Sequence, residues 1–225
     1  MAVTGSYMVG RVQRFALPYV AAYGQCFLRD VMPAFTNLEK RAEEVVEAEF
    51  QRLCSEPAYD DWDGDVASLA EAANDKGQAF YDTMAGMRQA ALNLFAVGLF
   101  HLLEQQLAYL CRDGAFTVPP PGDSKLCEVV AWFRGHFNLD LRTLAAWSSI
   151  DELRLVANAT KHAEGRSARQ LREHRPELFI SPFIVEKYPD AIERASWPIH
   201  LPLAGDDLAH HFETHSEEYY PEEGP

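Results

Sequence analysis

The feature that most constrains this chain is a helical spacing of apolar residues that continues through the middle of the sequence. Between residues 80 and 110 the apolar side chains recur mainly at steps of three and four: Phe80, Met84, Met87, Ala91, Leu94, Phe95, Gly98, Leu99, Leu102, Leu103 and Leu110. This spacing places them on one broad face of an α-helix, and Phe80 to Arg112 alone would span about 50 Å. We expect the helix to begin near Asp65, to have a weak point at Lys76–Gly77 and to end at Gly114.

Other stretches have helical patterns as well. Residues 17–53 are expected to be helical with an interruption near Pro33, because proline removes a backbone donor. Ser124 can cap a short helix that follows a proline-rich turn. Beyond residue 175, prolines break up short apolar pieces and the last residues are acidic. The pattern predicts an all-α helical bundle with long antiparallel helices over residues 1–175, followed by a short irregular, partly extended C-terminal appendage over residues 176–225.

The charge balance excludes some classes of protein. A net charge of −14, from 34 acidic and 20 basic side chains, disfavours a general nucleic-acid coat or a membrane-surface protein. No run approaches the 18 apolar residues of a membrane span, and we find no signal peptide. Each cysteine lies in an apolar stretch without a CxxC pair, which favours buried reduced thiols at Cys26, Cys54, Cys111 and Cys127. Reduced thiols suit a cytoplasmic protein, and no membrane association is expected.

Common cofactor and metal motifs are absent from the sequence. Dinucleotide-binding, P-loop, hydrolase and zincin motifs do not occur, so we expect no cofactor. His211 and His215 are four residues apart, as two metal ligands on a helix would be, and acids lie nearby. No cysteine accompanies them, and a solvated tail explains them as well. We therefore expect no metal site.

The helix expected at 150–163 has the clearest boundaries. Ser149 and Glu152 have the spacing of a capping box, and Gly165 follows as a stop. One face of this helix is apolar, and the opposite face gathers four polar side chains within about 100°: Arg154, Asn158, Lys161 and His162. Arginine and lysine can hold a phosphate, and histidine can move a proton near neutral pH. An amphipathic helix that turns its polar side to water accounts for the same pattern.

Basic residues are also concentrated in this part of the chain. Six of the 20 basic side chains fall within 22 positions: Arg154, Lys161, Arg166, Arg169, Arg172 and Arg175. An isolated basic patch in an acidic chain is a candidate site for an anionic ligand.

A family resemblance follows from these residues. The segment Phe100–Glu104, then Trp147, then a capped helix with Asn158-x-x-x-His162 and a glycine, resembles the HEPN superfamily. These are small all-α proteins, many of them metal-independent ribonucleases of toxin–antitoxin and phage-defence systems. Their motif is an arginine, four to six residues and a histidine, with a polar residue, often asparagine, directly after the arginine. Here the nearest arginine is Arg154, with seven residues between it and the histidine.

The resemblance implies a metal-independent endoribonuclease or a derivative of one. Arg154 and Lys161 would grip the scissile phosphate of an RNA substrate, His162 would transfer the proton, and Asn158 would orient the phosphate or the imidazole. The catalytic set would then be Arg154, Asn158 and His162, and the substrate-binding set Lys161, Arg166 and Arg169. Because family relatives pair through this helix, a homodimer is also expected.

A function of another class fits the same sequence. The displaced arginine favours a non-catalytic helical scaffold, or an antitoxin-like module that binds a protein partner through the acidic surface of the Asp60–Asp65 loop and the tail. Glu104 either orders Arg154 or His162 or is an ordinary surface acid. An open positive groove that contains Arg154 and His162 would favour the nuclease, whereas a buried His162 without a cleft would favour binding.

Overall fold

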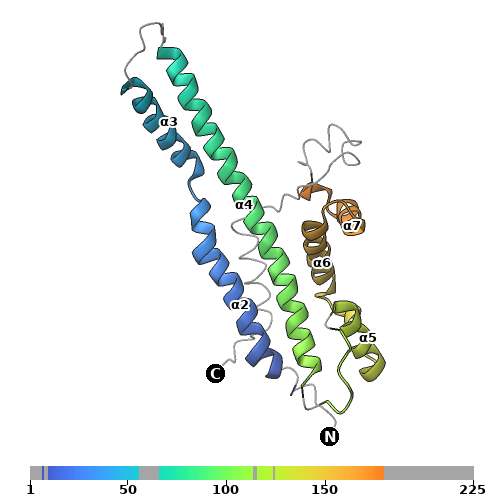
Figure 1. The fold of residues 1–225 in the computed structure, drawn as a ribbon. Helices are drawn as coiled ribbons and strands as arrows, with labels where there is room; N and C mark the ends of the chain where they lie inside the picture. Colours follow the sequence, from blue (N-terminus) through green and yellow to red (C-terminus); the bar gives the residue numbers. More distant parts are fainter. Residues whose placement is uncertain (1–6, 8–9, 56–65, 114–115, 124, 180–225) are drawn as a thin grey trace, which may run out of the picture.

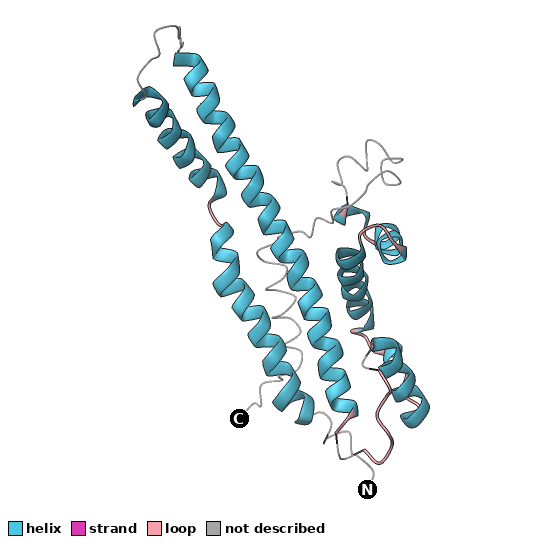
Figure 2. Cartoon of the chain, viewed as in Figure 1, coloured by secondary structure: helices cyan, strands magenta, loops and turns pink. Residues whose placement is uncertain are grey.

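A computed structural model describes most of the chain, namely residues 7, 10–55, 66–113, 116–123 and 125–179. All regular secondary structure in these residues is helical, so the predicted all-α bundle with long antiparallel helices is confirmed (Figures 1 and 2). The predicted appendage lies outside the described residues from position 180 onward, as do His211 and His215.

One long helix, α4 (Val66–Cys111), forms the axis of the molecule, with α2 (Leu17–Cys26) and α3 (Leu38–Ser55) along one side of it (Figure 1). The expected weak point at Gly77 does not interrupt α4, which is 46 residues long. A Cβ atom at Gly77 would lie only 2.3 Å from Cγ2 of Val46 on α3. Glycine therefore serves close helix packing here rather than a helix end. The expected ends at Asp65 and Gly114 lie outside the described residues.

The predicted interruption near Pro33 is confirmed. The helix α2 continues into a π-helical turn, Phe27–Val31, and then a 3₁₀ turn, Met32–Phe35, which contains the proline. Asn37 has a positive φ of 53°, and α3 begins at the next residue. Asparagine tolerates this left-handed conformation better than most residues, so the chain can change direction before α3.

Different interactions hold α2 and α3 against α4. At α2, the rings of Tyr23 and Phe27 stack on Phe95 of α4, with centroid distances of 4.8 and 4.2 Å. At α3, the carboxylate of Glu49 accepts hydrogen bonds from Arg52 at 2.8 and 2.9 Å and from Lys76 of α4 at 2.5 Å. These bonds, first from Arg52 and then from Lys76, lower the pKa of Glu49 to about 2.

The second side of α4 is covered by α5 (Leu126–Phe137) and α6 (Trp147–His162). The short helix α5 was expected to have Ser124 as its cap, but that residue lies outside the described part of the chain. The side chain of Glu104 on α4 instead accepts a hydrogen bond of 3.1 Å from the backbone N–H of Leu126, the first residue of α5. Glu104 thus stabilises a helix N-terminus, and the interpretation that it orders Arg154 or His162 is wrong.

Two expectations about burial are wrong. Met87 and Leu94, placed on the apolar face by their spacing, are 54% and 66% exposed, because α2 and α6 cover only the flanks of α4. Of the four cysteines, Cys111 alone is buried, and burial raises the pKa of its thiol to about 11. The exposed cysteines are Cys26, Cys54 and Cys127, which lie on outward faces of their helices.

By length and composition, α4 is also the one described helix that could cross a membrane, with a mean hydropathy of 1.3 over its most apolar 18-residue window. Asn93 and His101 divide the apolar part of α4, so it contains no uninterrupted run of 18 apolar residues. The core helix of a soluble protein meets the same two criteria, so this property alone assigns no membrane.

Candidate functional site

The candidate site is built on α6, whose apolar face is buried as the sequence predicts. Leu155, Val156 and Ala159 pack with Ala96 of α4 and with residues that follow α6 in the chain. Ala157 packs with Phe100, one turn further along α4. Because this face points into the core, the predicted polar residues of α6 lie on its outer side.

The predicted start of this helix is wrong by one turn. The helix begins at Trp147, the residue before it makes no side-chain cap, and Ser149 lies inside the helix rather than at its N-cap. The side chains of Trp147 and Ile150 pack on the cluster that contains Phe100. This apolar packing extends the helix past the local capping signal. Glu152, the other half of the expected capping box, forms an ion pair with Arg175.

The predicted end of the helix at residue 163 lies within one residue of the observed end, but Gly165 is not the residue that stops it. The helix ends at His162, and Ala163 is the C-cap residue with φ 49° and ψ −126°, a conformation that favours glycine. Gly165 has an extended conformation and is the N-cap of a further helix, α7 (Arg166–His174). The sequence analysis did not predict this helix as a separate element. Its amphipathic pattern is nevertheless present, because Ala168 and Leu171 are buried whereas the arginines between and beside them are not.

The junction of α6 and α7 contains a pocket of about 370 Å³. It is lined by Asn158, His162, Ala163, Gly165, Arg166, Ser167 and Ala168. Asn158 and His162 stand one helical turn apart on the outer side of α6, and Arg166 is the first residue of α7. The structure therefore brings together two of the predicted catalytic residues and one of the predicted substrate-binding residues.

Arg154 is not among the residues that line this pocket. Its Nε donates a hydrogen bond of 2.7 Å to the carboxylate of Asp151, one turn earlier on α6. Side chains on a helix lean toward its N-terminus, so this pairing holds the guanidinium on the side away from His162. Lys161 and Arg169 are exposed beside the pocket without lining it.

Ion pairs divide the basic segment into two groups. Arg172 donates to both carboxylate oxygens of Glu164, at 2.9 and 3.0 Å, and its guanidinium lies 4.7 Å from the ring centroid of Phe179. Arg175 pairs with Glu152 and Glu177. The contacts of Arg172 tie the α6–α7 turn and Phe179 to α7, and the pair of Arg175 with Glu152 ties the end of α7 to α6. The remaining basic residues form no ion pair with any described residue: Lys161, Arg166 and Arg169.

The contacts of Arg172 are a part of the site that the sequence analysis missed. Glu164 lies between two residues that line the pocket, so its pairing with Arg172 fixes the turn that shapes the pocket. Glu164 and Arg172 are eight residues apart in the sequence, and this separation does not indicate a known motif. Only the turn at Ala163 brings them together.

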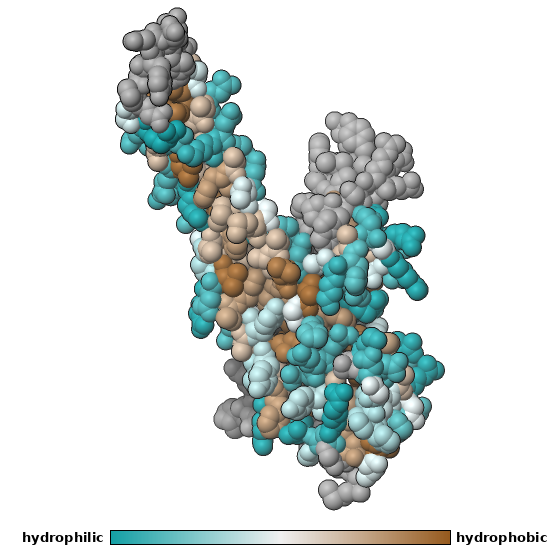
Figure 3. Space-filling view, viewed as in Figure 1, coloured by the Kyte–Doolittle hydropathy of each residue, from teal (hydrophilic) through white to brown (hydrophobic). Residues whose placement is uncertain are grey.

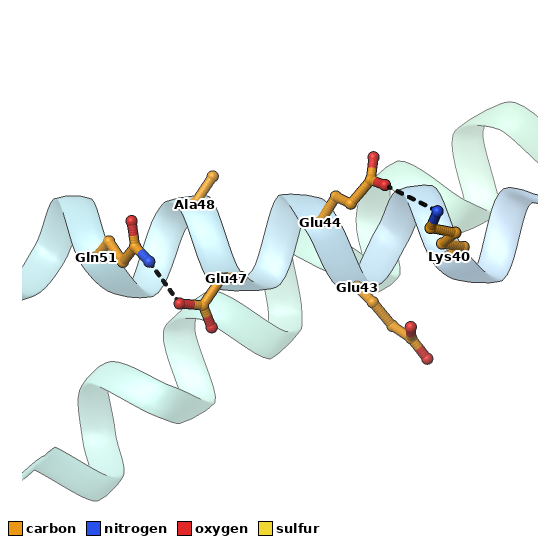
Figure 4. Close-up of a pocket in the computed structure, with 6 residues that line it drawn as sticks. All are labelled: Lys40, Glu43, Glu44, Glu47, Ala48 and Gln51. Carbon is orange, nitrogen blue, oxygen red and sulfur yellow. Dashed lines mark hydrogen bonds and ion pairs between the residues drawn. The ribbon is translucent and has the colours of Figure 1, made fainter.

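A hollow of about 420 Å³ lies on the surface of α3, lined by Lys40, Glu43, Glu44, Glu47, Ala48 and Gln51 (Figure 4). All of these residues belong to one helix. Lys40 pairs with Glu44 at 3.9 Å, and the Gln51 amide donates to Glu47 at 2.6 Å. These two pairs lie along the surface of a single helix, so the hollow is not an enclosed cavity between elements.

No cluster of metal-binding side chains occurs in the described part of the chain. Comparison with known proteins assigns no relationship either: no family model, no curated protein and no solved structure matches this chain. The candidate site therefore rests on its own residues.

Proposed function

We propose that the pocket between α6 and α7 binds a phosphate group of RNA and that His162 cleaves the RNA chain without a metal ion. The observation that carries the proposal is the convergence of Asn158, His162 and Arg166 on one pocket. This combination supplies an amide, an imidazole and a permanent cation within one small volume, in a segment richer in basic residues than the rest of an acidic chain.

The phosphate would be held from the α7 side of the pocket. Arg166 forms no ion pair with described residues, so its guanidinium is available to a phosphate oxygen. The first backbone amides of α7 have no partner within the helix, and no acidic residue occurs in its first turn. Arg166 thus takes the role that the family resemblance implied for Arg154, and Lys161 adds positive charge at the rim.

The chemistry would come from the α6 side. His162 accepts the proton of the ribose 2′-hydroxyl as its oxygen attacks the phosphorus, or donates a proton to the leaving 5′-oxygen. Asn158, one turn before it, orients the phosphate or the imidazole. Histidine suits both proton transfers because its ordinary pKa lies near neutrality.

The test is RNA cleavage in the presence of EDTA by the native protein and by His162→Ala. Loss of a general acid or base costs about 10²–10⁴-fold in rate, so the variant should be nearly inactive. His174→Ala is the matched control, because His174 is exposed at the far end of α7 and does not line the pocket. Equal cleavage by all three proteins, or cleavage only with added divalent metal, would contradict the proposal.

A second candidate, RNA or phosphate binding without cleavage, is favoured by the position of Arg154. With this side chain paired to Asp151, a single arginine remains in the pocket. On this alternative, His162→Ala would leave binding of a 2′-O-methyl RNA unchanged and no cleavage would occur. Arg166→Ala would weaken binding and reduce its salt dependence, whereas Arg134→Ala, an exposed arginine of α5, would not.

A further inference from the structure

Two neighbouring helices carry long segments without any charged side chain. Residues 15–28 and residues 89–103 contain no Asp, Glu, Lys or Arg, although charged residues make up 24% of the chain. The segments lie side by side, because Tyr23 and Phe27 of the first stack on Phe95 of the second. An uncharged layer of two helices is therefore present within a protein of net charge −14.

This layer leaves large apolar side chains exposed. On α4, Met87 and Leu94 are 54% and 66% exposed and stand seven residues apart, which places them on the same side of the helix. Across the layer, Phe15 and Tyr19 are 44% and 63% exposed. Figure 3 displays a continuous apolar surface over adjacent parts of α2 and α4. We call the surface formed by these four side chains and the uncharged segments the uncharged face.

We infer that the uncharged face binds a second copy of this chain. One pair of antiparallel helices leaves the apolar side chains on its outer face in water. Two such pairs, related by a two-fold axis, form a four-helix bundle that buries these side chains. Each copy would supply α2 and the facing part of α4, so that Leu94 of one copy is buried against the same surface of the other. This inference is independent of the proposed ribonuclease function.

The net charge of the protein favours this face, rather than another part of the surface, as the place where two copies contact each other. Two molecules that each carry −14 repel one another, and the repulsion is smallest where neither molecule presents a charged side chain. The face between residues 15–28 and 89–103 meets that condition on both copies except at its edge, where the Arg11 guanidinium lies 4.3 Å from the Phe15 ring centroid and pairs with Asp113. A partner chosen by charge, such as a basic protein, would have no acidic group to contact there.

Light scattering of the full chain tests the inference. The native protein should have twice the 25.4 kDa mass of one chain at micromolar concentration. Glutamate at both exposed positions, in the Met87→Glu/Leu94→Glu variant, should raise the dimer dissociation constant by about a hundredfold or more, because each copy would bury unpaired carboxylates. Val66→Glu is the control: Val66 lies on the same helix and is 64% exposed, but it is far from the uncharged face.

Circular dichroism of equal intensity would establish that these variants fold alike. A native protein of single-chain mass, or a dimer that persists in the double variant, would overturn the inference.

Cross-linking identifies the occupant directly. A photoreactive p-benzoylphenylalanine in place of Leu94, in a mixture of isotopically light and heavy full-length chains, should give light–heavy cross-links to α2 or α4. Cross-links from Leu94 to residues 180–225 of the same chain, or photoincorporation into added phosphatidylcholine vesicles instead of protein, would overturn the inference.

Discussion

Replacing Gly98 by alanine would test how closely α2 packs on α4. A Cβ atom at this position would lie 2.0 Å from the hydroxyl oxygen of Tyr23 and 2.9 Å from the ring carbon that bears it. The Tyr23 ring would have to move. It now stacks on Phe95 at 4.8 Å, and its hydroxyl donates a 3.3 Å hydrogen bond to the Phe95 carbonyl oxygen.

The expected change in stability follows from three contributions. Loss of the hydrogen bond costs about 0.5–1.5 kcal/mol, and loss of the ring contact costs about 0.5–1.5 kcal/mol. Alanine in a helix interior gains about 1 kcal/mol over glycine. The Gly98→Ala variant should therefore unfold with a free energy about 1 kcal/mol lower than the native protein, despite its better helix propensity.

Denaturant unfolding followed by circular dichroism measures this difference. Gly86→Ala is the control on the same helix, because nothing lies within 4 Å of its added Cβ, and it should stabilise the protein. In a Tyr23→Ala background, where the obstructing ring is gone, Gly98→Ala should stabilise as well. If Gly98→Ala stabilises the native background as much as Gly86→Ala does, the close approach of α2 to α4 is refuted.

Three further variants test other contacts. Ala163→Gly should raise the free energy of unfolding by about 1 kcal/mol, because glycine removes the strain at φ 49°; a less stable variant would contradict this conformation. Since hydrogen bonds from Arg52 and then Lys76 lower the pKa of Glu49 from 4.5 to about 2, its contribution to stability is present above pH 4.5 and lost as the pH falls toward 2. The difference in unfolding midpoint between the native protein and Glu49→Gln should shrink over that range, and a constant difference would argue against the ion pairs. Glu104→Ala should destabilise the protein by about 1 kcal/mol and speed hydrogen exchange at the first amides of α5, whereas unchanged exchange would exclude the cap.

Helix positions were largely predictable because apolar spacing and proline act locally. The spacing between Phe80 and Leu110 predicts the greater part of α4, and Pro33 marks the break between α2 and α3. Burial was less predictable, since a helical projection does not tell which flank a neighbour covers. Met87, Leu94 and Phe95 all belong to the apolar face that the spacing predicts. Phe95 is buried against α2, whereas Met87 and Leu94 are exposed.

At the candidate site, the residues on one helix were predictable and the contacts between helices were not. Asn158 and His162 follow from their i, i+4 spacing, and Arg166 from the local concentration of basic residues. The turn that joins them depends on Ala163 in a conformation that alanine disfavours, so no local signal predicts it. The pairing of Arg154 with Asp151 could have been predicted, because Asp151 is the only acid three or four residues from Arg154 on this helix.

The proposed cleavage of RNA by His162 without a metal ion is tested most directly by the chemical nature of the product ends. Attack by the 2′-oxygen forms a new bond to phosphorus, breaks the bond to the 5′-oxygen, and leaves a 2′,3′-cyclic phosphate and a 5′-hydroxyl. Mass spectrometry of RNA incubated with the native protein in EDTA should detect these two ends, and His162→Ala should produce neither. Products with 3′-hydroxyl and 5′-phosphate ends, or no cleavage of several RNAs, would contradict the account.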